Sequence, residues 1–119
     1  MINLSIITIN FNNKNGLLKT AQSIAEQSYR EFEWIVIDGG STDGSLDIIK
    51  QYQNQITYWC SEKDKGVYDA MNKGIKHSKG IWLNFMNSGD TFVNSKTLEN
   101  VFSETIPSTA KFLYSDTIS

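Results

Sequence analysis

A carboxylate beside two glycines marks the first segment of the sequence with candidate chemistry. Asp38 is followed by Gly39 and Gly40, and glycine lets a bound molecule approach the backbone closely. A carboxylate in that position can accept hydrogen bonds from the N–H groups of a base or the hydroxyls of a ribose. Asp38 is therefore a candidate ligand-binding residue, whereas Asp43, further along the same loop, is better explained as a cap of the next helix.

A second candidate is Asp90, which ends the run Asn87, Ser88, Gly89, Asp90. Mg²⁺ and Mn²⁺ accept oxygen ligands, and Mg²⁺ commonly takes only one or two protein carboxylates beside phosphate oxygens and water. Such an ion would act as a Lewis acid on a departing diphosphate. The alternative reading is a plain turn, since all four residue types favour turns.

The third segment runs from Ser61 to Gly74 and contains the start of a predicted helix. Lys65 stands just ahead of that helix, where an ammonium group and the helix N-terminus would act together on phosphate. Asp69 and Asn72 share one face of the helix by their i, i+3 spacing. For Lys63 and Asp64 two interpretations stand equally: they take part in such binding, or they are only the solvent-exposed start of the helix.

Alternating apolar runs and helical repeats must position these segments. Strands are predicted at 4–9, 32–37, 56–60, 81–86 and 111–114. Helices are predicted at 17–27, after the cap candidates at 41–43, from 67 to about 80, and more weakly at 96–102. Their inward residues are read as Leu17, Ala21, Ile24 and Ala25, then Leu46, Ile49 and Tyr52, then Val67, Met71 and Ile75.

Strict alternation of strand and helix predicts an α/β fold, a mainly parallel sheet with helices on both faces. In such sheets all strands end at one edge, and ligands bind outside those ends. The loops that begin at Asn10, Asp38 and Asn87 are the most polar ones and follow the first, second and fourth strands. We therefore expect them to converge on one site.

Composition narrows the function classes. The chain has 119 residues, 20% of them charged, and a net charge of −2, so it lacks the basic field that holds a nucleic acid. This length predicts one domain, 1–119. A single cysteine, Cys60, excludes an internal disulfide and favours a reduced, cytoplasmic compartment; Cys60 is read as a core residue and the lone His77 as a surface residue. No run approaches the ~18 apolar residues of a membrane span, and no signal peptide is evident.

Four segments together resemble the family 2 glycosyltransferases of the GT-A fold: SIITINFNN, WIVIDGGSTDGS, SEKDKGVYDAMNKGI and WLNFMNSGD. Each is a weak signal alone, but they occur in the family's order and spacing. The resemblance implies a Rossmann-like fold, a nucleotide-diphospho-sugar donor, and transfer with inversion to the hydroxyl of a glycan or lipid-linked acceptor, in polysaccharide or cell-surface glycan synthesis. A peripheral position at the inner face of the membrane is compatible with such an acceptor.

The resemblance also assigns residues by position. It implies that Thr8 and Asn10 line the nucleotide pocket and that Asp38 contacts the base. The residues Lys65, Asp69 and Asn72 resemble the family's donor-binding segment. Asp90 resembles the last aspartate of the DxD-type motif and would hold Mg²⁺ or Mn²⁺, although Gly89 stands where relatives often have another carboxylate.

The acceptor-binding half and its general base are not found in this sequence. The family's base is an Asp or Glu of that half, and we expect it beyond Ser119, so that residues 1–119 alone would be inactive. The non-enzymatic alternative is a domain of the same fold that only binds a sugar nucleotide or a partner chain. A dinucleotide-binding fold and a P-loop are excluded because the sequence lacks the glycine motifs that each requires. A phosphoacceptor receiver domain needs a pair of carboxylates after the first strand, and asparagines occupy that loop here.

Overall fold

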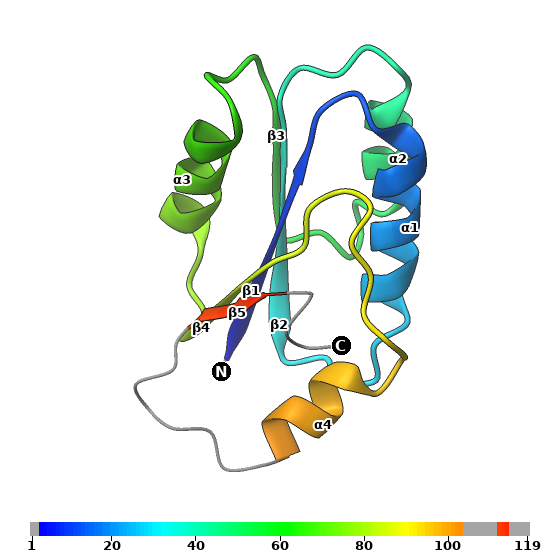
Figure 1. The fold of residues 1–119 in the computed structure, drawn as a ribbon, viewed down its shortest axis with the longest axis vertical. Coiled ribbons are helices and arrows are strands. Elements are labelled where there is room, and N and C mark those ends of the chain that lie inside the picture. Colours follow the sequence, from blue (N-terminus) through cyan, green and yellow to red (C-terminus); the bar gives the residue numbers. More distant parts are fainter. Residues whose placement is uncertain (1–2, 104–111, 115–119) are drawn as a thin grey trace.

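The computed structural model describes residues 3–103 and 112–114 and shows strands and helices in strict alternation (Figure 1). The elements are β1 (Leu4–Asn10), α1 (Lys14–Ala25), β2 (Phe32–Asp38), α2 (Ser45–Gln51), β3 (Tyr58–Ser61), α3 (Val67–His77), β4 (Trp82–Phe85), α4 (Thr97–Ser103) and β5 (Phe112–Tyr114). Every predicted strand and helix is present, with ends that differ by a few residues.

The five strands form one parallel sheet in the order β3-β2-β1-β4-β5. The chain first builds outward from β1 through β2 to β3 and then returns to the other side of β1 with β4. Asn10 pairs in register with Asp38, and Asp38 pairs with Ser61, so three strands end side by side. The predicted α/β fold with a parallel sheet is confirmed, and strand order reverses next to β1.

Helices cover both faces of the sheet, as predicted. The helices α1 and α2 lie on one face, and α3 lies on the other (Figure 1). One core cluster contains Trp34, Leu17 and Ile49, and a second contains Ile7, Ile35 and Ala70. Strands β1 and β2 are buried between the two layers, which explains their continuous apolar sequences. No helix within 3–103 and 112–114 has the length and apolar character of a membrane span.

Two helix starts differ from the sequence prediction. Helix α1 begins at Lys14 rather than Leu17, because the Asn13 side chain caps it by accepting a hydrogen bond from the Gly16 backbone N–H at 3.2 Å. Helix α2 begins at Ser45, and its N-cap is Gly44, with φ of 97°, instead of a residue within 41–43. Asp43 still serves this helix, since its carboxylate accepts from the Ser45 backbone N–H at 3.0 Å.

The inward face of α3 was predicted wrongly in two of its three residues, since only Met71 packs against the core. Val67 and Ile75 are 56% and 40% exposed, while Ala70 and Gly74 are the buried residues of this helix. A Cβ on Gly74 would come within 2.4 Å of Ile7 Cγ2, so the helix backbone packs directly against β1. Small residues permit this close approach, and it holds the start of α3 close to the carboxyl ends of the strands.

Candidate functional site

Asp38 is the centre of a buried hydrogen-bond network at the ends of three strands. Its Oδ1 accepts from Asn10 Nδ2 at 2.8 Å and from Ser41 Oγ at 2.7 Å. Its Oδ2 accepts from Ser61 Oγ and the Ser41 backbone N–H, both at 2.8 Å, and from the Gly40 backbone N–H at 3.1 Å. These five donors come from the last residues of β1 and β3, Asn10 and Ser61, and from Gly40 and Ser41 in the loop after β2. They surround both oxygens of a side chain with no exposed surface.

The hydrogen bonds also keep Asp38 ionised. Burial by itself raises the pKa of this carboxyl, but the bonds from Ser41, Asn10 and Ser61 outweigh burial and bring the pKa below its usual value. A charged Asp38 is stable here because its protein partners replace water. Direct contact between Asp38 and a base stays a prediction, and such contact would have to displace one of these partners.

Asn10 carries the network across to β4. While its Nδ2 donates to Asp38, its Oδ1 accepts from Ser88 Oγ at 2.6 Å. We call the five connected side chains the strand-end network: Asn10, Asp38, Ser41, Ser61 and Ser88. The loops expected to converge from Asn10, Asp38 and Asn87 therefore meet at one edge of the sheet.

Asp90 lies at the same edge, in a tight turn. Its Oδ2 accepts from the Asn87 backbone N–H at 3.0 Å, and Gly89 has a φ of 104°, which glycine adopts without strain. The Thr20 hydroxyl of α1 donates to the Asp90 carbonyl at 2.7 Å and fixes the turn. The carboxylate is half-buried, and its Oδ1 has no protein partner among the described residues.

Thr8 lies deeper than the resemblance suggested. The side chain has no exposed surface, and its Oγ1 accepts from the Trp34 indole Nε1 at 3.0 Å in the core beneath α1 and α2. The pocket described next lies toward α3, on the other face of the sheet. A nucleotide contact by Thr8 stays a prediction, while its observed role is to satisfy the buried indole N–H.

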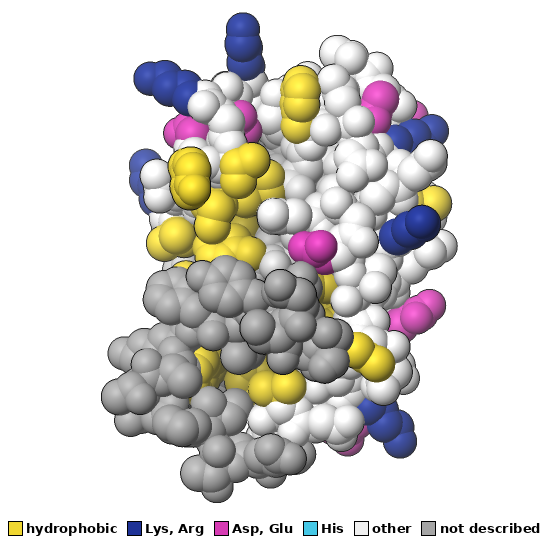
Figure 2. Space-filling view, viewed as in Figure 1, with side chains coloured by type: hydrophobic (Ala, Val, Ile, Leu, Met, Phe, Trp, Pro, Cys, Tyr) yellow, Lys and Arg dark blue, Asp and Glu magenta, His cyan; other side chains and the backbone are white. Residues whose placement is uncertain are grey.

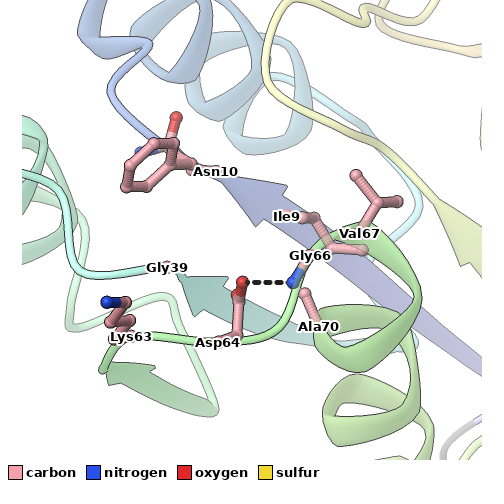
Figure 3. Close-up of a pocket in the computed structure, with 9 residues that line it drawn as sticks. Ile9, Asn10, Gly39, Lys63, Asp64, Gly66, Val67 and Ala70 are labelled. Atoms are coloured by element: carbon pink, nitrogen blue, oxygen red, sulfur yellow. Dashed lines mark hydrogen bonds between the residues drawn. The ribbon is translucent and has the colours of Figure 1, made fainter.

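A pocket of about 310 Å³ opens between the ends of β1 and β2 and the start of α3 (Figure 3). The residues that line it are Ile9, Asn10, Phe11, Gly39, Lys63, Asp64, Gly66, Val67 and Ala70. The walls are largely apolar, and the Asp64 carboxylate points between Gly39 and Gly66 (Figure 3). Among the residues predicted for the site, only Asn10 lines this pocket.

Phe11 and Asp64 are pocket residues that the sequence analysis did not assign. Both approach Gly39 closely: a Cβ there would lie 3.0 Å from Asp64 Oδ2 and 3.2 Å from Phe11 Cδ1. The Phe11 ring is 61% exposed, unusual for a large apolar side chain that could be buried. The sequence signals that could have identified them were their positions: Phe11 directly follows the first strand, and Asp64 lies just ahead of a helix.

Apolar side chains are also exposed beside the mouth of this pocket. Val67 and Tyr68, at the start of α3, are 56% and 83% exposed. In Figure 2 apolar side chains gather on the α3 side of the molecule, whereas the surface over α1 and α2 is mainly polar. The pocket therefore suits a flat, mostly apolar group with a few polar atoms.

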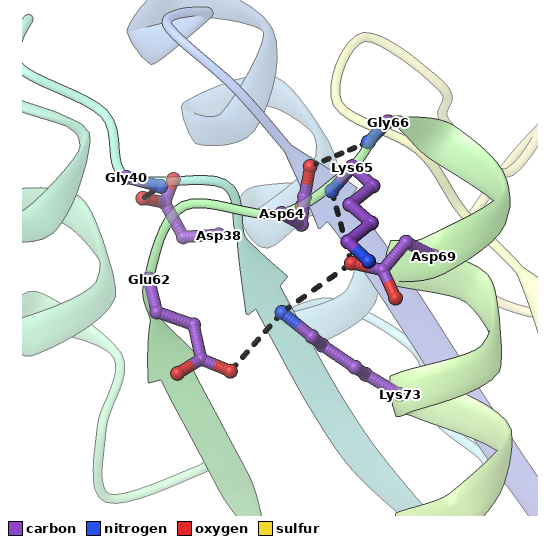
Figure 4. Close-up of polar contacts among 8 residues, drawn as sticks. All are labelled: Asp38, Gly40, Glu62, Asp64, Lys65, Gly66, Asp69 and Lys73. Carbon is purple, nitrogen blue, oxygen red and sulfur yellow. Dashed lines mark hydrogen bonds and ion pairs between the residues drawn. The ribbon is translucent and has the colours of Figure 1, made fainter.

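Of the remaining predicted residues, Asp69 and Asn72 lie on α3 and Lys65 lies on the loop before it. Figure 4 shows Lys65 and Asp69. The Asp69 Oδ2 accepts from the Lys65 backbone N–H at 2.9 Å, and it lies 3.7 Å from Lys73 Nζ. Asn72 is exposed and lies two positions from both Ala70 and Gly74, on the helix face turned away from the sheet. The structure thus brings Asp69 and Lys65 together and places Asn72 elsewhere.

Asp43 occupies the opposite side of the strand ends. Its carboxylate accepts from the Lys14 backbone N–H at 2.9 Å and from Ser45, so it caps the starts of both α1 and α2. Hydrogen bonding to Ser45 lowers its pKa. A negative side chain therefore already occupies the starts of both helices, where an anion would otherwise bind.

Cys60 and His77 show structural roles. The Cys60 side chain is half-buried against the second core cluster, and burial raises the pKa of its thiol, which disfavours the nucleophilic thiolate. The His77 ring stacks on Tyr58, with centroids 3.9 Å apart. Neither residue lines the pocket.

The donor set near Asp90 fits a divalent cation that is held mostly by its ligand. No group of three or more His, Cys, Asp or Glu side chains within residues 3–103 would hold a metal by itself. Asp90 offers one carboxylate oxygen at the edge where the strand-end network reaches Ser88. Mg²⁺ and Mn²⁺ bind in this way when phosphate oxygens and water supply the other positions.

A parallel sheet covered on both faces, with a pocket at the strand ends beside a change in strand order, is the arrangement in which open α/β sheets bind their ligands. The comparisons with known proteins are more specific. The chain belongs to glycosyl transferase family 2, whose model matches residues 5–105. The predicted family and its GT-A fold are therefore confirmed.

Two curated relatives illustrate the match. An uncharacterized glycosyltransferase of Mycobacterium tuberculosis is 47% identical over 90 residues, which are 75% of this chain and 34% of that protein. A PGL/p-HBAD biosynthesis glycosyltransferase of Mycobacterium bovis is 37% identical over 100 residues, covering 82% of this chain and 39% of the relative. The chain thus spans little more than a third of the length of these relatives.

Two solved structures show the same fold. The S. aureus protein TarS in complex with UDP-GlcNAc superimposes with a TM-score of 0.76 at 26% identity, over 86% of this chain and 30% of TarS. A mannosyltransferase from Pyrobaculum calidifontis, solved with GDP-Man and Mn²⁺, gives a TM-score of 0.75 at 20% identity over 84% of this chain and 31% of that chain. The second likeness establishes the fold alone.

Proposed function

We propose that this chain binds the nucleotide-diphospho-sugar donor of an inverting glycosyltransferase, which transfers the sugar to an acceptor hydroxyl on a glycan or lipid-linked molecule. Family membership supports the reaction class. Relatives named for PGL/p-HBAD and teichuronic acid biosynthesis support a role in making polysaccharides or cell-surface glycans.

The pocket between β1, β2 and α3 is the observation that carries the donor-binding proposal. Its apolar walls and about 310 Å³ suit a nucleobase, and the exposed Phe11 ring offers a face for stacking. Asp64 supplies an acceptor for a base N–H group, and Asn10 lies at the inner end. The base would occupy this pocket.

The diphosphate would then lie along the edge that joins the pocket to the turn at Asp90. Lys63 and Lys65 bring positive charge to the loop before α3. When bound, Mg²⁺ or Mn²⁺ would offset charge on the departing diphosphate, and Asp90 would hold it. The chain's own residues orient the donor: the strand-end network fixes the three loops that meet there.

The acceptor side is left unassigned. Inversion requires a base on the face opposite the leaving group, and neither Asp38 nor Asp90 meets that demand from the donor side. The inactivity of residues 1–119 alone and the cytoplasmic location stay predictions. Direct donor contacts by Thr8, Asp38, Lys65, Asp69 and Asn72 also stay predictions.

Calorimetry of the full-length protein with UDP-, GDP- and dTDP-sugars, with and without Mn²⁺, tests the proposal. We expect one nucleotide series to bind and Mn²⁺ to strengthen that binding. Asp90→Asn should abolish the Mn²⁺ effect while leaving binding without metal in place. An unchanged Mn²⁺ effect in this variant would show the metal assignment to be wrong, and no binding of any sugar nucleotide would end the proposal.

If the sugar nucleotide binds but the full-length protein transfers no sugar to any glycan or lipid-linked hydroxyl acceptor, the non-catalytic alternative holds. A donor-hydrolysis assay alongside separates a missing acceptor from a missing reaction, because release of the sugar to water would show that the donor bond can be broken without the acceptor.

A further inference from the structure

The loop Glu62–Gly66 forms one wall of the pocket, and side chains of α3 form polar contacts with both ends of this loop. Lys63 and Asp64, in the middle of the loop, line the pocket. Two side chains of α3, Asp69 and Lys73, contact the residues on either side of this pair (Figure 4). The proposed function gives Asp69 a place in donor binding but does not explain this arrangement.

Lys73 holds the first end of the loop. Its Nζ lies 3.0 Å from Glu62 Oε1, and only 24% of the side chain is exposed. The hydrogen bond to Glu62 raises the pKa of Lys73, so this ammonium stays charged through the physiological range. The Glu62 backbone N–H also donates to the Asp38 carbonyl at 3.0 Å, which joins this end to β2.

Asp69 holds the second end. Its Oδ2 accepts from the Lys65 backbone N–H at 2.9 Å and lies 3.7 Å from the same Lys73 ammonium. The next residue, Gly66, has a φ of 117°, and a Cβ there would meet nothing within 4 Å. No side chain packs over this side of Gly66, and hydrogen bonds to Asp64, Asp69 and Ala70 restrain the junction between loop and helix.

We propose that Asp69 and Lys73 are positioning residues, which hold the loop Glu62–Gly66 so that Asp64 faces the nucleobase. They form a clamp, defined as Asp69, Lys73 and Glu62, which acts through the loop without touching the donor; for Asp69 this proposal replaces the donor contact that the sequence resemblance implied. The clamp rests on the proposed function, because it shapes the same pocket. Partly exposed ion pairs add little to folding stability, so the clamp should act mainly on ligand affinity.

A ligand series on the full-length protein separates positioning from direct contact. The probes are UMP, UDP and UDP-GlcNAc, with the guanine equivalents GMP, GDP and GDP-mannose in parallel, measured by calorimetry. Lys73→Met and Asp69→Asn should each weaken all three members of the series that binds by a similar factor, about three- to tenfold. Melting temperatures should stay close to that of the wild type.

Two controls sharpen this result. Lys73→Arg keeps the charge and should restore affinity, while Lys76→Met, an exposed lysine on the same helix, should change nothing. Because the clamp is ionic, the loss caused by Lys73→Met should shrink at high salt. A lysine that served only folding would instead lower the melting temperature of Lys73→Met together with its affinity.

Three results would overturn the clamp. Losses that grow from UMP to UDP-GlcNAc would mean that Asp69 or Lys73 contacts the diphosphate or the sugar. Unchanged affinities in both variants would mean that the loop needs no clamp. If the wild type binds no nucleotide at all, the proposed function is wrong and the clamp proposal falls with it. The first two results contradict the clamp alone, because the wild type still binds nucleotide in both.

Discussion

Asp38 and Asp64 are two carboxylates beside glycines at the same edge of the sheet, yet their surroundings differ. Asp38 is fully buried, and five donors of the strand-end network and its loop surround it. Asp64 is half-buried, accepts from the Gly66 backbone N–H at 3.0 Å, and lines an open pocket. Hydrogen-bond saturation, more than position at a strand end, therefore distinguishes the carboxylate that holds the loops together from the one that lines the pocket.

The largest expected effect is on folding stability, from Asp38→Asn. The amide would turn an N–H₂ group toward backbone and hydroxyl donors, leaving buried groups unpaired at a cost of about 3 kcal/mol. Urea denaturation of the full-length protein measures this. Asp64→Asn is the matched variant and should change the free energy of unfolding by less than about 1 kcal/mol, while weakening nucleotide binding. Equal losses in both variants would erase the comparison.

Next in size is Gly74→Ala, which tests how closely α3 approaches β1. The added methyl group would lie within 2.4 Å of Ile7 Cγ2, so helix or strand must shift, at a cost of about 2 kcal/mol. Because α3 also forms a wall of the pocket, nucleotide affinity should fall as well. Ala70→Gly is the control at the other buried position of α3. It removes a methyl group from the contact with the sheet, so it should lower stability without moving the helix. A fully stable, fully binding Gly74→Ala protein would contradict this packing.

A smaller effect is expected from Phe11→Ala, on binding alone. Stacking of an aromatic ring on a base is worth ~1–3 kcal/mol, so affinity for the nucleotide should fall about tenfold. The 61% exposed ring contributes little to the core, and the melting temperature should hardly change. Phe11→Tyr keeps the ring and should bind as the wild type does. Calorimetry measures the nucleotide affinity of both variants. Unchanged affinity in Phe11→Ala would show that the base does not bind in this pocket.

The pH dependence of stability gives the smallest effect at neutral pH. Since folding lowers the pKa of Asp38, its ionised form contributes stability above the unfolded pKa of ~3.9, and that contribution is lost as pH falls through the folded value. One proton limits the slope to ~1.4 kcal/mol per pH unit. Urea denaturation between pH 2.5 and 6 should show a steeper acid loss in the wild type than in Asp38→Asn. Parallel curves would show that Asp38 is not the group responsible.

Much of the fold follows from local pattern. The continuous apolar runs of β1 and β2 predict strands buried on both faces, and their alternation with helical repeats predicts a parallel sheet. The starts of the helices were harder to predict from the sequence. Asn13 looks like part of a polar loop, and only the structure shows that its side chain caps α1 by accepting a hydrogen bond from the Gly16 backbone N–H. The buried face of α3 was missed because Ala70 and Gly74 give a weak apolar signal, although their small size is what allows contact with Ile7.

Sequence reasoning predicts the α/β alternation, the family and the edge of the sheet where polar loops gather, because these depend on residue type and spacing along the chain. Which polar side chains remain available at that edge depends on the tertiary structure. Asp38 meets Asn10, Ser41 and Ser61 across strands, and Phe11 meets Gly39 and Asp64 around a pocket. Hydrogen bonding and burial depend on neighbours distant in the chain, so the same residue type supports the fold in one place and faces a ligand in another.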